Sequence, residues 1–169
     1  MKKVLLVLLL FCFFFSASYS QLSREEKKEY NSAKELIAEE KYRDAKDIFS
    51  RFYEKDSDNL EYNFYNGICQ LNTDNFDAAV ENFDFIISHY EKTKEESEFT
   101  RSSYFYKAQA FHDLYMFDTE IEILEKIKEF ELNDREKEIL EKKMKVSKTA
   151  LELYRNFQPI LVKRISSVN

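Results

Sequence analysis

The amino-acid sequence contains three copies of one pattern, and this repetition constrains the fold more than any other feature. A shift of 34 residues aligns the first copy with the second, and a further shift of 41 aligns the second with the third. In each copy an aromatic residue follows a small residue by nine positions, and apolar residues lie seven and ten positions further on. The aligned columns are Ala33, Gly67 and Ala108; Tyr42, Phe76 and Phe117; Phe49, Phe83 and Leu124; and Phe52, Ile86 and Ile127. Repetition at spacings of this length is typical of stacked supersecondary units that bury their apolar faces only against one another.

The composition indicates that the repeated unit is helical. The chain has one Gly and one Pro, which are too few for a protein built from strands and tight turns. The apolar columns fall at helical spacing, so we expect each copy to be a hairpin of two helices that cross at the small residue. Polar clusters at 56–59, 72–75 and 133–134 supply helix-capping side chains, and Asn133 with Glu136 forms a predicted capping box. The seven extra residues of the second spacing fit in the polar stretch 91–97, where an insertion costs little.

This pattern resembles the tetratricopeptide repeat over about residues 26 to 130. The resemblance implies an all-α, right-handed α-solenoid of about three helical hairpins, at about residues 26–59, 60–97 and 101–133, within a repeat region of 21–133. The third copy departs from the pattern because Glu120 stands where Ala45 and Ala79 stand in the other two. Two outcomes are open there: the third pair of helices is splayed, or Glu120 turns outward.

The first 20 residues are predicted to be a secretory signal peptide rather than part of the fold. Lys2 and Lys3 precede an unbroken apolar run at 4–15, and small residues follow at Ser18 and Ser20. This layout predicts cleavage between Ser20 and Gln21 and export to the periplasm or outside the cell, with no membrane span in the mature chain. A retained membrane anchor and a lipid attached at Cys12 are the alternatives.

A long amphipathic stretch at 134–169 follows the repeats. One apolar stripe contains Ile139, Val146, Leu153 and Phe157, and an adjacent stripe contains Leu140, Met144, Leu151 and Tyr154. We expect a capping helix that closes the stack, with a dimerisation helix as the alternative. Pro159 is expected to end the helix. The apolar tail at 160–165 then docks either on the body or on a partner.

The sequence offers no catalytic constellation, metal site or cofactor motif. Neither His89 nor His112 has a second His or Cys at metal-ligand spacing, and one glycine cannot build a phosphate-binding loop. Cys69 is the one cysteine left after signal cleavage and is interpreted as a small buried residue. The net charge of −6, which becomes −8 once Lys2 and Lys3 leave, argues against nucleic acid and anionic membranes as partners.

The predicted function is therefore that of a non-enzymatic adaptor or scaffold that binds another protein. The resemblance implies that the first helix of each hairpin lines a concave face where a partner segment lies. The candidate partner-binding residues on these helices are Tyr30, Lys34, Ile37, Phe64, Ile68, Leu71, Phe105, Gln109 and His112. The aromatic column of Tyr30, Phe64 and Phe105 is open to two interpretations, as binding anchors or as core between repeats.

The apolar residues in these columns suit a helix or extended segment better than a terminal carboxylate. A structural subunit of a cell-envelope (outer-membrane) assembly complex is the alternative function, and an enzyme is a more distant one.

Overall fold

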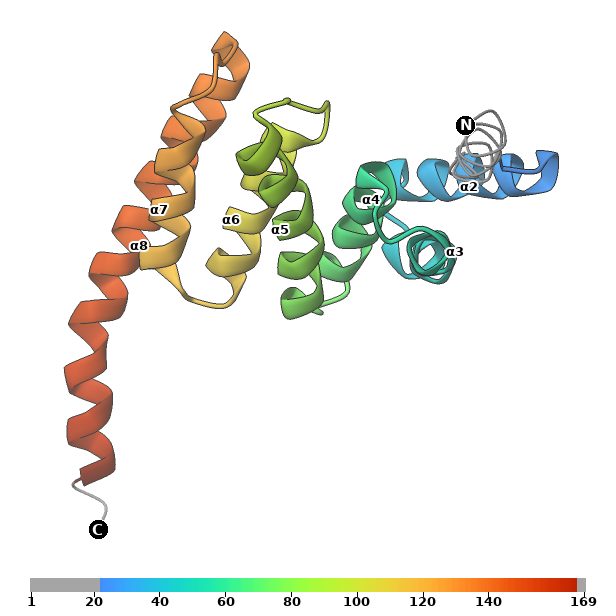
Figure 1. Ribbon diagram of the computed structural model, residues 1–169. Coiled ribbons are helices and arrows are strands. Elements are labelled where there is room, and N and C mark those ends of the chain that lie inside the picture. Colours follow the sequence, from blue (N-terminus) through green and yellow to red (C-terminus); the bar gives the residue numbers. More distant parts are fainter. Residues whose placement is uncertain (1–21, 167–169) are drawn as a thin grey trace, which may run out of the picture.

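The computed structural model describes residues 22–166, and the side chains of residues 22–157. The described part contains seven helices and no strand (Figure 1). The helices are α2 (Arg24–Ala38), α3 (Tyr42–Lys55), α4 (Leu60–Leu71), α5 (Phe76–Thr93), α6 (Thr100–Asp113), α7 (Phe117–Ile127) and α8 (Asp134–Ser166). No helix in this part of the chain has the length and apolarity that crossing a membrane requires. The predicted signal peptide and its cleavage site lie outside the described residues.

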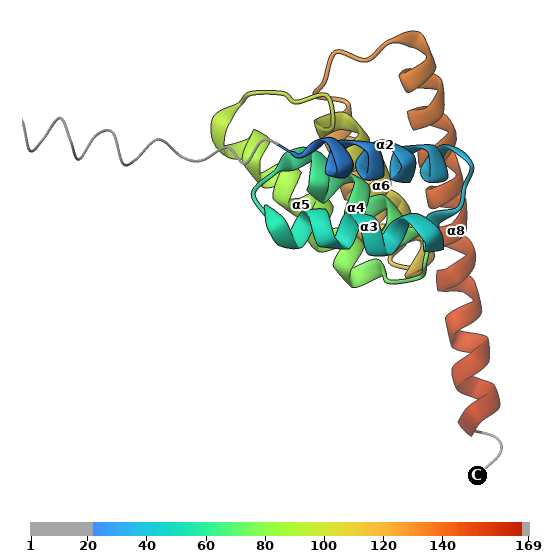
Figure 2. The ribbon, with the colours of Figure 1, turned by 90° about the vertical axis from the view of Figure 1, so that its right-hand side faces the viewer.

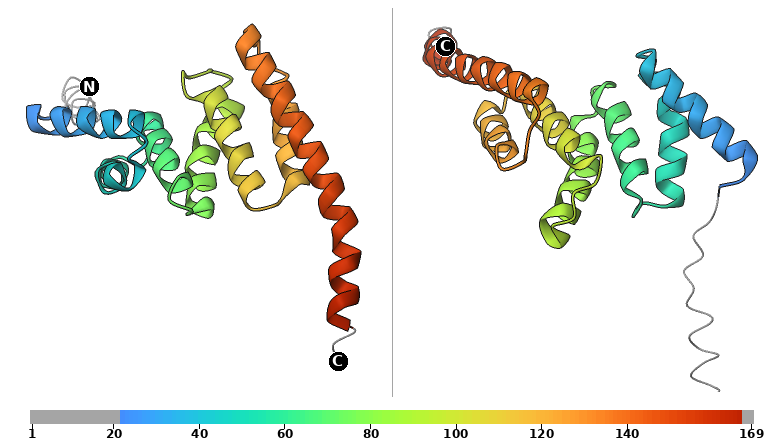
Figure 3. Two further views of the ribbon diagram at one scale, coloured as in Figure 1. Left: turned by 180° about the vertical axis from the view of Figure 1, so that it is seen from behind. Right: turned by 90° about the horizontal axis from the view of Figure 1, so that it is seen from above.

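The helices form three hairpins, α2 with α3, α4 with α5, and α6 with α7, followed by α8. Each helix packs mainly on its neighbours in the sequence, and α4 also contacts α6. The hairpins stand side by side in a row that runs from α2 and α3 at one end to α8 at the other (Figures 1 and 3). The predicted all-α helical-repeat architecture is therefore confirmed, and the second helix of each hairpin begins at its predicted aromatic residue, Tyr42, Phe76 or Phe117.

The repeated columns form the core of the stack. Ala33, Gly67 and Ala108 are all buried, and so are the residues of the Phe49 and Phe52 columns. At Gly67, an added Cβ would lie 2.8 Å from Cε1 of Phe83 and 3.2 Å from Cβ of Asn82, so α4 and α5 approach each other too closely there for a larger side chain. The small column is thus explained by the crossing of two helices, as the sequence predicts.

The helix ends use part of the predicted capping chemistry. The Asn133–Glu136 capping box is present, with the Glu136 amide donating to Asn133 at 3.0 Å and the Asn133 amide donating to Glu136 at 2.8 Å. Asn59 accepts from two amides at the start of α4. Asn75, in contrast, makes no capping bond to α5, and its side-chain amide donates to Gln70 at the end of α4. The extra residues of the second spacing lie partly in α5, which has 18 residues against 14 in α3, and partly in the loop that follows it.

Helix α8 is longer than predicted. It continues through Pro159 to Ser166, so the expectation that Pro159 ends the helix is wrong. A proline removes one main-chain hydrogen bond and kinks a helix, but the turns on either side keep their own bonds. With 33 residues α8 is about 50 Å long at 1.5 Å per residue, and its C-terminal half projects beyond the body of repeats (Figures 1 and 3). The backbone of the predicted tail therefore extends the helix away from the body and does not fold back on it.

Candidate functional site

Four of the nine predicted partner-binding residues are buried in the core, namely Tyr30, Phe64, Ile68 and Leu71. The centre of the Tyr30 ring lies 5.4 Å from that of Phe49 and 5.0 Å from that of Phe52, and both of these residues are buried on α3. The Phe64 ring packs on Phe99 at 4.8 Å. Phe105 is partly buried against the core of the third hairpin. For Tyr30 and Phe64 the structure thus favours the core interpretation of the aromatic column, because little of either ring is available to a partner.

Lys34 and Ile37 lie on α2 and are partly exposed. The Lys34 ammonium is 3.2 Å from the Glu61 carboxylate and 4.9 Å from the centre of the Tyr65 ring. These contacts join α2 to α4, so Lys34 already has partners within the protein. Ile37 packs against the core clusters of the first two hairpins. This end of the stack offers little unpartnered apolar surface.

The remaining two predicted residues, Gln109 and His112, lie at the opposite end, in a groove that α6 and α7 form with α8. This α6–α8 groove has a volume of about 360 Å³ and is lined by Gln109, His112, Glu120, Ile139, Lys142, Lys143 and Val146. The Lys143 ammonium donates to Oε1 of Gln109 at 2.7 Å, and Nε2 of Gln109 donates to Asp113 at 3.0 Å. Gln109 and His112 were named as candidates from the sequence, but the residues of α8 that line this groove with them were not.

Glu120 lies beneath this groove and is only 2% exposed. Its Oε2 is 2.9 Å from Nδ1 of His112, which lies on the facing helix α6. The suggestion that Glu120 turns outward is therefore wrong, because the imidazole provides the polar partner that a buried carboxylate requires. Lys143 lies close by, and burial lowers the pKa of its ammonium, although the negative charges of Glu120 and Asp113 act in the opposite direction. The substitution of Ala by Glu in the third repeat thus creates a polar cluster under the groove.

The two apolar stripes of α8 have different environments over the first half of the helix, whereas farther on Leu151 of the second stripe is partly exposed and Tyr154 is 44% exposed. Leu140 and Met144 are buried against α7, so α8 closes the stack as predicted. The other stripe is exposed, by 39% at Ile139, 49% at Val146, 52% at Leu153 and 59% at Phe157; these four residues are called the α8 stripe. Its first two members line the α6–α8 groove, and the other two continue the same face towards the C-terminal end of α8. A simple capping helix would present a polar outer face, whereas this one presents large apolar side chains.

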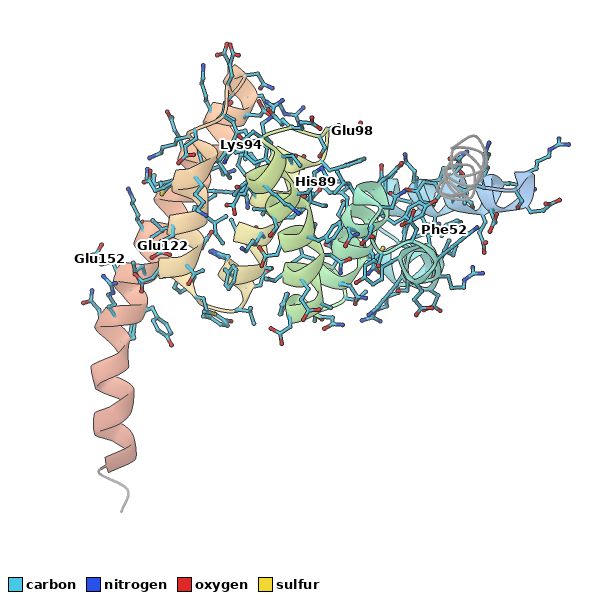
Figure 4. All side chains as sticks on the ribbon, in the orientation of Figure 1. Phe52, His89, Lys94, Glu98, Glu122 and Glu152 are labelled. Carbon is cyan, nitrogen blue, oxygen red and sulfur yellow. The ribbon has the colours of Figure 1, made fainter. Side chains whose placement is uncertain are left out.

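The described residues hold no group of three or more His, Cys, Asp or Glu side chains placed to bind a metal ion. His89 is exposed on α5 (Figure 4), whereas His112 lines the α6–α8 groove and contacts Glu120. Cys69 is fully buried, and burial raises the pKa of its thiol to about 12. At neutral pH it is therefore a protonated core side chain, in line with its interpretation from the sequence.

Neither the family models nor the curated proteins searched contain a match to this chain. Among solved structures, the chain is similar to the type III secretion translocator chaperone SycD of Yersinia enterocolitica, with a TM-score of 0.62 and 17% identity over 83% of this chain and 92% of SycD. It is also similar to SycD in complex with a peptide of the translocator YopD, with a TM-score of 0.59 and 17% identity over 79% of this chain and 97% of that one. At this identity the likeness concerns the fold, and it supports the tetratricopeptide-like arrangement of helices.

Proposed function

We propose that the protein is a non-enzymatic adaptor that binds a segment of another protein along the α6–α8 groove and the α8 stripe. The observation that carries this proposal is the row of four exposed apolar side chains that begins in the groove and continues along α8. Exposing large apolar side chains in a row is costly for a soluble surface, and such patches usually mark a binding site. That SycD was solved with a peptide of a second protein supports a binding role for this kind of helical stack.

The spacing of the α8 stripe favours a helical partner. Ile139, Val146 and Leu153 are seven residues apart, which is the period that keeps two packed helices in contact. From Ile139 to Phe157 the stripe spans about 27 Å, the length of five helical turns. Lys142 borders its first part and supplies a hydrogen-bond donor for the polar edge of the partner, beside Gln109 and His112, which are bonded within the protein. We therefore expect an amphipathic helix with an apolar face of the same length.

We propose that this binding takes place outside the cytoplasm, because the N-terminal sequence has the layout of a secretory signal. The basic residues Lys2 and Lys3, the apolar run at 4–15 and the small residues at Ser18 and Ser20 are those of a secretory signal. The partner would then be a periplasmic or secreted protein. Mass spectrometry of the N-terminus of the protein isolated from its own cells tests this part; a chain that retains residues 1–20 would contradict cleavage.

Site-specific photo-crosslinking tests the binding role. A benzoylphenylalanine at Val146 should capture the partner in the producing cells, whereas the same group at exposed Arg43 on α3 should not. The captured segment, made as a synthetic peptide, is then titrated against the wild-type protein and against Val146→Asp/Leu153→Asp. At about 1 kcal/mol or more for each interfacial side chain, the double variant should bind about thirtyfold more weakly or worse.

Both replaced side chains are exposed, so the variant should keep the melting temperature of the wild type. An unchanged dissociation constant in a folded double variant would refute the site. Capture of a second copy of the protein at Val146 would replace the adaptor role with self-association.

A further inference from the structure

A second, larger cavity lies on the other side of α8 from the groove. It has a volume of about 710 Å³ and lies between α8 and the linker at residues 128–133, which arches from the end of α7 to the start of α8 (Figure 2). Its lining residues are Lys128, Phe130, Leu132, Lys137, Leu140, Glu141, Met144, Lys145, Lys148 and Thr149. Glu141 and Lys148 are two and nine positions after Ile139, or about 200° and 180° around the helix, so this cavity and the α8 stripe face opposite ways.

The cavity combines an apolar floor with a basic rim. Phe130, Leu132, Leu140 and Met144 belong to or pack against the core of the third hairpin and form the floor. The rim carries Lys128, Lys137, Lys145 and Lys148, all exposed, against the single acidic residue Glu141. We call this site the lysine-rimmed cavity. The rim is thus locally basic, although the chain as a whole has a net charge of −6.

Two of the four lysines have no ion-pair partner among the described residues. Lys128 pairs with Glu125, and Lys137 lies 3.7 Å from Asp134. The ion pairs within 4.0 Å in this part of the protein include neither Lys145 nor Lys148. These two lysines lie about one turn apart, towards the C-terminal end of the α8 lining. Neither ammonium is held in a close pair, although the charge of Lys148 helps Lys128 to lower the pKa of the exposed Glu125 carboxyl. The arrangement is complementary to a ligand that has carboxylates beside apolar groups.

The shape indicates a chain segment as the ligand. The lining residues on α8 extend from Lys137 to Thr149, which is about 18 Å or just over three helical turns. A long, open depression of this kind accepts the side chains along one face of a helix, whereas a compact hole would suit a small molecule. From these observations we propose that the lysine-rimmed cavity docks an acidic amphipathic helix of a partner protein, with apolar residues on the floor and Glu or Asp against Lys145 and Lys148.

A designed peptide tests this inference independently of the α6–α8 groove. The probe is a labelled helical 14-residue peptide with Leu at positions i, i+3, i+4 and i+7 and Glu on the flanking positions. The charge-reversed peptide carries Lys in place of each Glu. We expect the acidic peptide to bind the wild-type protein more weakly as salt is added, and Lys145→Glu/Lys148→Glu to reduce its affinity by about tenfold or more. The charge-reversed peptide should show the opposite preference and bind the double variant better than the wild type.

Two control variants show whether peptide binding depends on this cavity, on the net charge of the protein, or on the α6–α8 groove. Lys27→Glu/Lys28→Glu changes the net charge equally at the far end of the stack, on exposed positions of α2, and should leave binding unchanged. Val146→Asp/Leu153→Asp should also leave it unchanged, because those residues lie on the other face of α8. Equal binding of the acidic peptide to the wild type and to Lys145→Glu/Lys148→Glu would refute the inference. Two other results would also refute it. One is that the wild-type protein is a dimer and Lys145→Glu/Lys148→Glu is a monomer. The other is that the wild-type protein binds vesicles containing phosphatidylserine more strongly than it binds the peptide.

Discussion

Glu120 is the residue at which the third repeat departs from the first two, and its surroundings explain how the departure is tolerated. In the other copies the position is occupied by the fully buried Ala45 and Ala79. A carboxylate placed there loses its hydration and needs a polar partner, which His112 provides at 2.9 Å from the facing helix. The polar floor of the groove is therefore a consequence of one substitution in the repeat.

A double-mutant cycle measures this interaction. His112→Ala leaves the Glu120 carboxylate buried without its partner, so we expect the free energy of unfolding at pH 7 to fall by about 1–3 kcal/mol. In a Glu120→Gln background the same substitution should cost clearly less, because no charge is then left buried. Urea denaturation of the four proteins gives the coupling. Equal costs in both backgrounds would show that His112 does not support the carboxylate.

Cys69 allows a simple check of the core packing. Its side chain is fully buried and the pKa of its thiol is raised to about 12, so almost no thiolate forms near neutral pH. In a chain that begins at Gln21, where Cys69 is the only cysteine, we expect no reaction with Ellman's reagent at pH 8 on a scale of minutes, and complete reaction in urea. Because the folded-state pKa is raised, reactivity should stay low as the pH rises towards 10. Rapid labelling of the native protein would mean that α3 and α4 are not packed as described.

At the level of the helices, the turns inside the three hairpins share an unusual backbone conformation. Glu40, Asp74 and Tyr115 occupy equivalent positions in the repeats, just after the first helix, and have φ values of 58°, 62° and 59°. At the third turn, the Met116 amide donates to the Phe111 carbonyl and the Tyr115 amide to the His112 carbonyl, both at 2.9 Å, and the other two turns have the same pair of bonds. This is the Schellman arrangement, which normally has Gly at the left-handed position.

Substitution of Tyr115 tests the strain in these turns. A non-glycine residue in this conformation costs about 1 kcal/mol, so Tyr115→Gly should be more stable than Tyr115→Ala by about that amount. The two variants lose the same exposed ring, which leaves the backbone as the difference between them. Thermal or urea unfolding of both proteins gives the comparison. An alanine variant at least as stable as the glycine variant would contradict the assigned conformation.

The elements differ in how far the sequence could predict them. The Tyr42, Phe76 and Phe117 column predicted the start of three helices, because the hairpins pack in the same way and each needs an aromatic residue at the same place. The turns before them were not predicted as left-handed, since none of the three carries Gly. The extent of α8 was misjudged at Pro159, where the loss of one hydrogen bond does not end the helix. Which stripe of α8 stays exposed depends on how α8 rotates against α7, and no local pattern in the sequence records that rotation.

For the molecule as a whole, the stack places its unpartnered surface at the α8 end. Tyr30 and Phe64, two of the residues that the repeat pattern singled out for binding, are instead held between hairpins. The α8 stripe and the lysine-rimmed cavity lie back to back on one helix. Its first half is part of the core, and it contacts the start of α7 as far as Tyr154 and Arg155 before it projects from the body. In a linear array each element depends mainly on its neighbours, so α8 should influence the third hairpin much more than the first.

Two truncations test this division of α8. A chain ending at Thr149 keeps Leu140 and Met144, so we expect its melting temperature to stay within about 5 °C of the full-length value while partner binding is lost with Leu153 and Phe157. A chain ending at Asn133 loses the burial of Leu140 and Met144, worth about 1.5–3 kcal/mol each, and should melt about 10 °C lower or more. Similar melting temperatures for the two truncated chains would contradict the core role of the first half.

The adaptor role is tested most directly by hydrogen–deuterium exchange of the protein with and without the segment captured at Val146. The proposed site predicts slower exchange in the bound state for amides of α6 near Gln109 and His112 and of α8 from Ile139 to Phe157. Amides of α3, at the other end of the stack, should exchange at the same rate in both states. Protection of α2 and α4 with no change along α8 would contradict the site and move the binding surface to the first two hairpins.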